Sequence, residues 1–131
     1  MNKFPLHLTR YQFTIAFDGK PLDNEKNFCR FSGLLESSCG QKSKLLDLIP
    51  KTPFEDKTKL LEIMNCYNEL IPALIKGTEN LRQGILIGFA TYEEALAASR
   101  QVIDTEILIS KTNSRILEIF KSINACEGLF E

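Results

Sequence analysis

Hydrophobic residues in the last third of the chain recur at the spacing of a single helix face. Five residues share this face: Val102, Ile109, Ile116, Phe120 and Ile123. A capping box at residues 91–94 precedes them, so we expect a helix over residues 92–126. A continuous helix of that length would span about 50 Å, which is longer than a domain of this size needs. It would therefore either break at the polar residues 110–114 or present an apolar face to a partner.

The middle of the chain predicts a second helix. Residues 52–55 form a capping box with proline at the first helical position. Hydrophobic residues then recur at helical spacing over residues 60–75, and we expect Gly77 to close the helix. Pro72 lies inside this pattern and lacks a backbone N–H, so we expect it to kink or divide the helix.

A shorter helical pattern comes before these two. Residues 23–24 can cap a first helix, which the cluster of small and polar residues 37–40 is expected to end. Residues 45–49 then resemble a short helical turn that Pro50 stops.

The N-terminal part predicts a β element. Residues 11–17 alternate between apolar and other side chains, as in a half-buried strand, and the turn sequence 18–19 precedes a short returning segment at 20–22. We expect residues 1–131 to form a single, mainly α domain: a small helical bundle with a short N-terminal β strand or hairpin. The alternative is an α+β fold in which Gly84–Ala90 is a second buried strand, because so short an apolar run does not distinguish strand from helix.

Composition and charge narrow the class of protein. The chain has 131 residues, 44% of them hydrophobic and 25% charged, with a net charge of −1. This balance is typical of a globular protein and argues against a dedicated binder of nucleic acids or membrane surfaces. The N-terminus lacks the apolar run of a secretory signal, and the chain lacks the run of about 20 apolar residues that spans a membrane. We therefore expect a cytoplasmic protein.

The sequence offers few residues for catalysis. It lacks the glycine-rich motifs that bind phosphates or dinucleotides, and His7 is its single histidine. The four cysteines have no C-x-x-C spacing, which argues against a zinc site. Cys39, beside Gly40, is the best candidate for a reactive thiol. Three carboxylates, Glu55, Glu62 and Glu69, are spaced along one helix face, where a solvated surface is the simpler interpretation. We assign no catalytic, cofactor-binding or metal-binding residue.

The surplus of apolar helix surface is the sharpest functional signal. We expect a non-enzymatic helical module, such as an adaptor, an assembly chaperone or an inhibitor, that binds a protein partner or a second copy of itself through the five residues named first. The alternatives are a small cysteine- or carboxylate-dependent enzyme and a nucleic-acid-associated factor. A further reading is that the last helix breaks and both halves pack within the domain.

Overall fold

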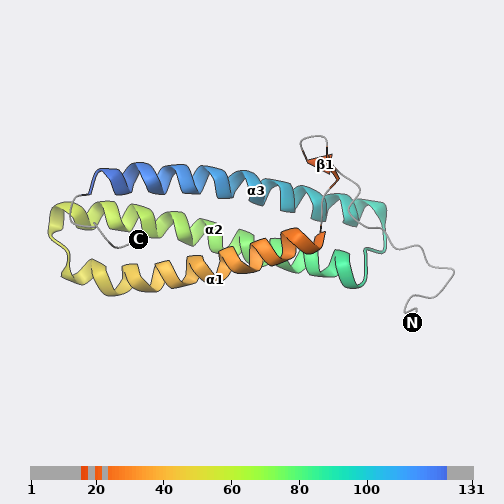
Figure 1. Cartoon of the computed structure of the whole chain (residues 1–131), viewed down its shortest axis with the longest axis horizontal. Coiled ribbons are helices and arrows are strands. Elements are labelled where there is room, and N and C mark those ends of the chain that lie inside the picture. Colours follow the sequence, from red (N-terminus) through yellow and green to blue (C-terminus); the bar gives the residue numbers. More distant parts are fainter. Residues whose placement is uncertain (1–15, 18–19, 22–23, 124–131) are drawn as a thin grey trace.

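Helix α2 (Phe54–Leu86) is the central element of the protein, and two further helices pack along it. In the computed structural model, which describes residues 16–17, 20–21 and 24–123, α1 (Asn24–Leu48) and α3 (Tyr92–Lys121) both run antiparallel to α2. A 3-10 turn, η1 (Ile49–Lys51), follows α1 (Figure 1). The expectation of a mainly helical bundle is confirmed for the described residues.

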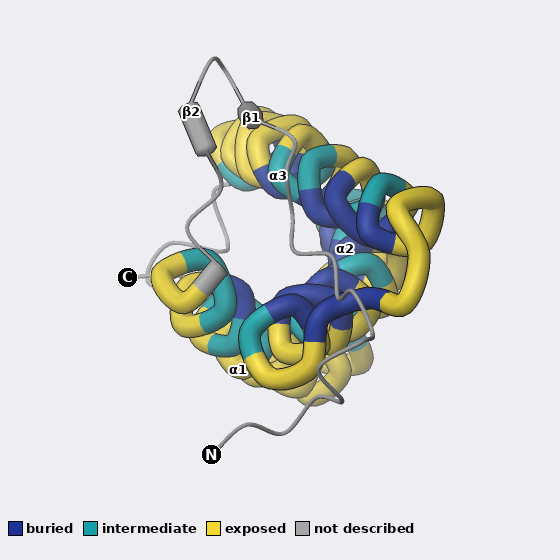
Figure 2. The backbone as a smooth tube through the Cα atoms, turned by 90° about the vertical axis from the view of Figure 1, so that its right-hand side faces the viewer, coloured by how far each residue is buried: buried dark blue, intermediate teal, exposed yellow. Residues whose placement is uncertain are grey.

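The core runs along the axis of the bundle, where the three helices face one another. One cluster, toward the α1–α2 turn, joins Leu45 of α1 to Ile63 of α2 and Ile119 of α3. A second cluster, toward the other end, joins Phe31 of α1 to Leu74 of α2 and further residues of α3. Figure 2 shows this arrangement end-on, with buried residues on the inward sides of the helices. Burial of these side chains, rather than helix propensity alone, therefore stabilises the long helices.

Helix α1 is longer than the sequence predicted, because the cluster at residues 37–40 does not end it. Phe31, Ser38 and Leu45 are buried at seven-residue intervals, so one continuous face packs on the core and carries the helix through the polar cluster. The separate turn expected at residues 45–49 is instead the end of α1 followed by η1.

Helix α2 also differs from the expectation in its end and its cap. It continues past Gly77 and ends only at Leu86. Of the two alternatives at Pro72, a divided helix is wrong, because Pro72 lies inside a single helix. Gly77 lies inside the core, where continued packing outweighs the low helix propensity of glycine. The capping box at Thr52 does not form: Pro53 is the cap residue, and the Thr52 hydroxyl donates to the carbonyl oxygen of Leu48 at 2.7 Å. That hydroxyl satisfies a carbonyl at the end of α1 instead of an N–H of α2.

The alternative of a buried strand at Gly84–Ala90 is wrong. Gly84 to Leu86 belong to the last turn of α2. The N–H groups of Ile87 and Gly88 both donate to the Gln83 carbonyl, and Gly88 adopts a positive φ of 81°. Such a left-handed residue is the usual end of a helix, and glycine reaches it without strain.

Helix α3 is one helix over residues 92–121, so the polar residues 110–114 do not break it. The predicted cap at its start is confirmed, because the Thr91 hydroxyl accepts a hydrogen bond from the Glu94 N–H at 3.1 Å. Within the polar stretch, Thr112 is buried on the inner side of the helix, whereas Asn113 is exposed. The stretch is thus an ordinary amphipathic part of the helix. The helix ends at Lys121, with Ser122 as its C-terminal cap, so the expected extension to residue 126 is wrong.

The N-terminal β element is only partly within the described residues. Strands β1 (Ala16–Phe17) and β2 (Lys20–Pro21) pair antiparallel, with Ala16 opposite Pro21. The longer strand expected over residues 11–17 lies mostly outside them, so that expectation stays a prediction.

Candidate interaction surface

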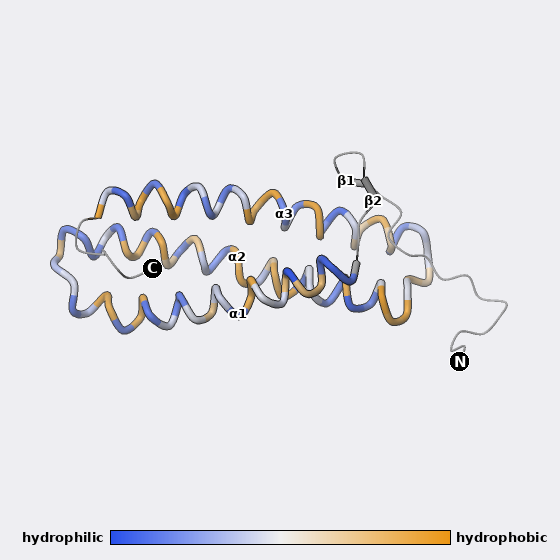
Figure 3. The backbone as a smooth tube through the Cα atoms, viewed as in Figure 1, coloured by the Kyte–Doolittle hydropathy of each residue, from blue (hydrophilic) through white to orange (hydrophobic). Residues whose placement is uncertain are grey.

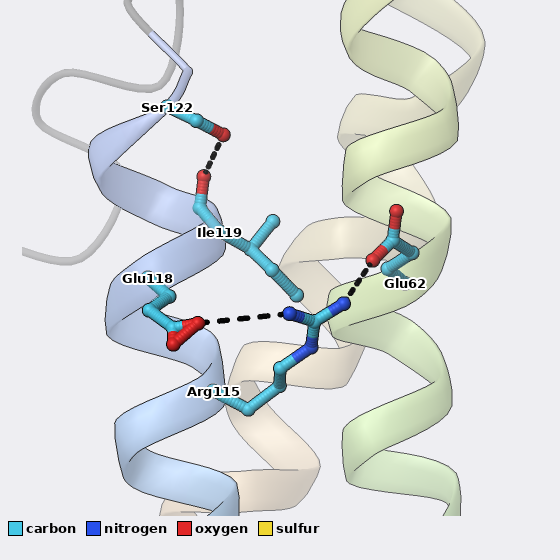
Figure 4. Close-up of polar contacts among 5 residues, drawn as sticks. All are labelled: Glu62, Arg115, Glu118, Ile119 and Ser122. Carbon is cyan, nitrogen blue, oxygen red and sulfur yellow. Dashed lines mark hydrogen bonds and ion pairs between the residues drawn. The ribbon is translucent and has the colours of Figure 1, made fainter.

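The five residues predicted as an interface face the inside of the bundle. Val102 is fully buried, Ile109 and Ile123 are each 4% exposed, and Ile116 and Phe120 are partly buried against the core. Figure 4 shows Ile119, next to this stripe, pointing from α3 toward α2. The stripe exists because α3 needs a core-facing side along its whole length, and α2 is long enough to cover it.

Other large apolar side chains remain exposed. They are spread over all three helices and the α2–α3 turn: Leu46, Phe54, Leu61, Ile75, Leu86, Ile87, Tyr92, Ile107 and Leu117. Single exposed apolar residues are common on protein surfaces, so the informative ones are those that gather at a hollow. Leu86 and Ile87, at 61% and 47% exposed, meet that condition.

Among the described residues, α1 does not cover the last turns of α2, because α1 is shorter than α2. Helix α1 has 25 residues and α2 has 33, a difference of about 12 Å of helix. In Figure 1 the C-terminal end of α2 extends past the first turn of α1, and Figure 3 shows hydrophobic residues at this end. In the part of the chain that the structure describes, apolar residues at the end of α2 thus have no part of α1 opposite them.

A groove forms where the two helices diverge. Its walls are Glu25, Phe28 and Cys29 of α1 and Arg82, Ile85 and Leu86 of α2, and they enclose a hollow of about 360 Å³. On each wall the residues are spaced i, i+3 and i+4, so they share one helix face. A second hollow of about 300 Å³ adjoins it through Arg82 and Leu86 and extends to Glu79, Gln83 and Ile87. We call these nine residues the α1–α2 groove.

The charged residues of the groove are unpaired among the described residues. Arg82 and Glu25 line the same hollow, yet neither belongs to an ion pair there. The ion pairs among the described residues lie elsewhere: Arg30 of α1 bonds Glu106 of α3, and Arg115 contacts two carboxylates, as Figure 4 shows. The groove therefore presents apolar residues flanked by three charged side chains, Glu25, Glu79 and Arg82.

A different, polar hollow of about 390 Å³ lies between α2 and α3, lined in part by Asn80 and Gln101. The Asn80 amide donates to Gln101 Oε1 at 2.9 Å, and the Gln101 amide donates to the Ala73 carbonyl at 3.1 Å and to the Thr105 hydroxyl at 2.9 Å. These groups satisfy one another across the two helices. The arrangement fixes the register of α2 against α3.

The candidates for catalysis are not brought together. Cys39 is exposed on α1, and Cys66 lies on α2, where burial raises the pKa of its thiol and so disfavours the reactive thiolate. Glu62 is engaged by Arg115 at 2.8 Å. Over residues 25–123, no three histidine, cysteine or acidic side chains are grouped to hold a metal ion.

Known proteins give no guide to the role of this surface, since no protein-family model, curated protein or solved structure matches the chain. Within the described part of the chain, no helix is both long and apolar enough to cross a membrane.

The sequence did not predict that Phe28, Ile85 and Leu86 line a groove at the surface. The apolar run at Gly84–Ala90 was the available signal, because it continues a helical pattern beyond Gly77. Its exposure depends on where α1 begins relative to the end of α2, which the pattern of either helix alone does not show.

Proposed function

We propose that this protein is a non-enzymatic, helical protein-interaction module of the adaptor, assembly-chaperone or inhibitor type. Its binding surface is the α1–α2 groove rather than the stripe of α3. The observation that supports it most is the exposure of Leu86 and Ile87 beside the hollow lined by Phe28 and Ile85. A groove between two helices that is lined by Phe28, Ile85 and Leu86 suits an amphipathic helix, which buries its apolar face there.

The test compares two substitutions of exposed apolar residues on α2. Leu86→Asp puts a charge in the groove, whereas Ile75→Asp, at a site that is 44% exposed and outside the groove, is the matched control. Both variants should remain folded by circular dichroism, because neither site is buried. The tagged protein should retain a binding partner from its native cells as wild type and as Ile75→Asp, and lose it as Leu86→Asp.

The captured partner is then purified and titrated against all three proteins by calorimetry. We expect a loss of at least tenfold in affinity for Leu86→Asp alone, since central apolar contacts dominate most interfaces. Equal affinity for Leu86→Asp and Ile75→Asp would show that the groove is not the binding surface.

A further inference from the structure

We infer that the polar hollow between α2 and α3 binds a small linear zwitterion, a molecule with a primary ammonium group at one end and a carboxylate at the other. The inference goes beyond the proposed function, because Gln83 alone of the described residues lines both this hollow and the α1–α2 groove. The volume of the hollow, about 390 Å³, is within the range of small-molecule sites. The inference rests on how the amide groups in its walls are oriented.

A backbone carbonyl fixes the orientation of two of these amides. The Ala73 carbonyl can only accept, so Gln101 presents Nε2 to it, and the two atoms lie 3.1 Å apart. Gln101 Oε1 then faces Asn80, which donates through Nδ2 at 2.9 Å. Turning either amide over would bring two acceptors together. Asn80 Oδ1 is therefore held as an acceptor, and it takes part in no hydrogen bond among the described residues.

The free oxygen of Asn80 opens into the hollow, although the residue is only 9% exposed. Among the described residues, the side-chain oxygens that are sealed from solvent and lack a hydrogen bond are those of Gln41, Thr78 and Ser99. The Asn80 oxygen is not one of them, so it is accessible from the hollow that Asn80 lines. An acceptor on a buried residue costs free energy when it has no partner, so the hollow favours an occupant that donates hydrogen bonds.

Two further acceptors line the same hollow. Gln83 lies one turn beyond Asn80 on α2, and its Nε2 donates to the Gly88 carbonyl at 3.3 Å, which leaves Oε1 as an acceptor. The carboxylate of Glu94 lines the hollow from α3. A primary ammonium group has three N–H donors and a positive charge, so it matches these three oxygen groups in number and in charge.

The other end of the hollow carries a positive charge. Gln101 bonds to both Ala73 and Asn80, so Lys76, which lies between these two on α2, is level with Gln101. Glu94 precedes Gln101 by seven residues, or about 10 Å along α3. The remaining lining residues are apolar: Phe89, Ala97 and Ala98. Lys76 is therefore placed to pair with a carboxylate while Glu94 pairs with the ammonium group.

The separation of Lys76 from Glu94 selects the length of the ligand. An α-amino acid carries both charges on one carbon atom and is too short to reach both ends of the hollow. An ω-amino acid such as ε-aminocaproate has a chain of methylene groups between its charges, and this chain can contact the apolar lining. The same spacing is available in a short peptide.

Titration of the full chain with ε-aminocaproate, followed by ligand-detected NMR, tests the inference. We expect saturable binding with a dissociation constant on the order of 1 mM, because the ligand is small and the site is open on one side. Glycine should bind about tenfold more weakly, since it reaches only one end of the hollow. Hexylamine, which lacks the carboxylate, serves as the second comparison ligand.

Variants of the two exposed charged residues assign the orientation of the ligand. Glu94→Gln should weaken the binding of both ε-aminocaproate and hexylamine by about fivefold, whereas Lys76→Met should weaken the binding of ε-aminocaproate alone. Glu93→Gln is the matched control, because Glu93 is also exposed in the first turn of α3 but does not line the hollow. Circular dichroism checks that all three variants are folded.

Three outcomes would overturn the inference. They are a wild type that shows no saturable binding of ε-aminocaproate up to about 20 mM, glycine bound as tightly as ε-aminocaproate, and equal affinities for Glu94→Gln and Glu93→Gln. Because Lys76 and Glu94 lie outside the α1–α2 groove, each of these results would leave the proposed function unchanged.

Discussion

At the scale of single residues, one glycine determines how closely α1 approaches α2. A Cβ atom at Gly77 would lie 2.7 Å from Cε2 and 2.9 Å from Cδ2 of the Phe31 ring. Phe31 is fully buried, so the ring has little space into which to move. Gly77 therefore lets an aromatic side chain pack directly on the backbone of the central helix.

Gly77→Ala is expected to lower the free energy of unfolding by about 1–2 kcal/mol. Overpacking against Phe31 costs roughly 1–3 kcal/mol, which outweighs the gain of up to about 1 kcal/mol in helix propensity. Gly33→Ala on α1 is the control, because a Cβ there meets nothing within 4 Å and the propensity gain should appear as increased stability. Urea denaturation of both variants measures the difference. Stabilisation by Gly77→Ala would contradict the close approach of Phe31.

At the scale of elements, the sequence predicted the spacing of apolar residues along the helices better than where the helices begin and end. The Thr91 cap and the apolar face of α3 were recognisable, because each depends on residues close together in the sequence. The continuation of α1 beyond Gly40 was not, since it depends on Phe31 and Leu45 packing against other helices while Ser38, between them, is polar. Packing against the other helices, which local helix propensity does not describe, thus determined where α1 ends.

Pro72 offers a test of this idea at the centre of α2. Its side chain is exposed, so Pro72→Ala loses little packing and regains a backbone N–H inside the helix. We expect the free energy of unfolding to rise by about 1–3 kcal/mol, reduced by the greater freedom that alanine gives the unfolded chain.

Pro53→Ala is the matched control. Pro53 is also exposed but caps α2, where a missing N–H is not needed, so we expect a change of less than about 1 kcal/mol. Thermal and urea denaturation of the two variants give the comparison. A Pro72→Ala variant less stable than the wild type would mean that the proline favours the local geometry of α2.

At the scale of the whole molecule, the structure places the apolar stripe of α3, which suggested a partner, in the core of the bundle. The heptad stripe of α3 could be predicted from sequence as an apolar face, but not as an inner one, because a core and an interface use the same residues. Which apolar residues remain outside depends on the relative lengths of α1 and α2. The groove at Leu86 follows from that mismatch.

Two substitutions on α3 distinguish the inner face from the outer one. Ile109→Asp places a charge at a site that is 4% exposed, and we expect it to cost more than about 4 kcal/mol and to abolish cooperative unfolding. Ile107→Asp, at a site that is 43% exposed, should cost less than about 1 kcal/mol. Circular dichroism with thermal melting measures both. If Ile109→Asp remained folded and melted cooperatively, Ile109 would not be a core residue and the stripe would be an exposed face of α3.

The central position of α2 has a consequence for how the chain folds. The main packing joins α1 to α2 and α2 to α3, which are neighbours along the chain linked by short turns. Closing such short loops costs little entropy, so either helical hairpin can form first and serve as a template for the remaining helix. The two routes converge on the same core, and the ion pair between Arg30 and Glu106 forms only when both are complete.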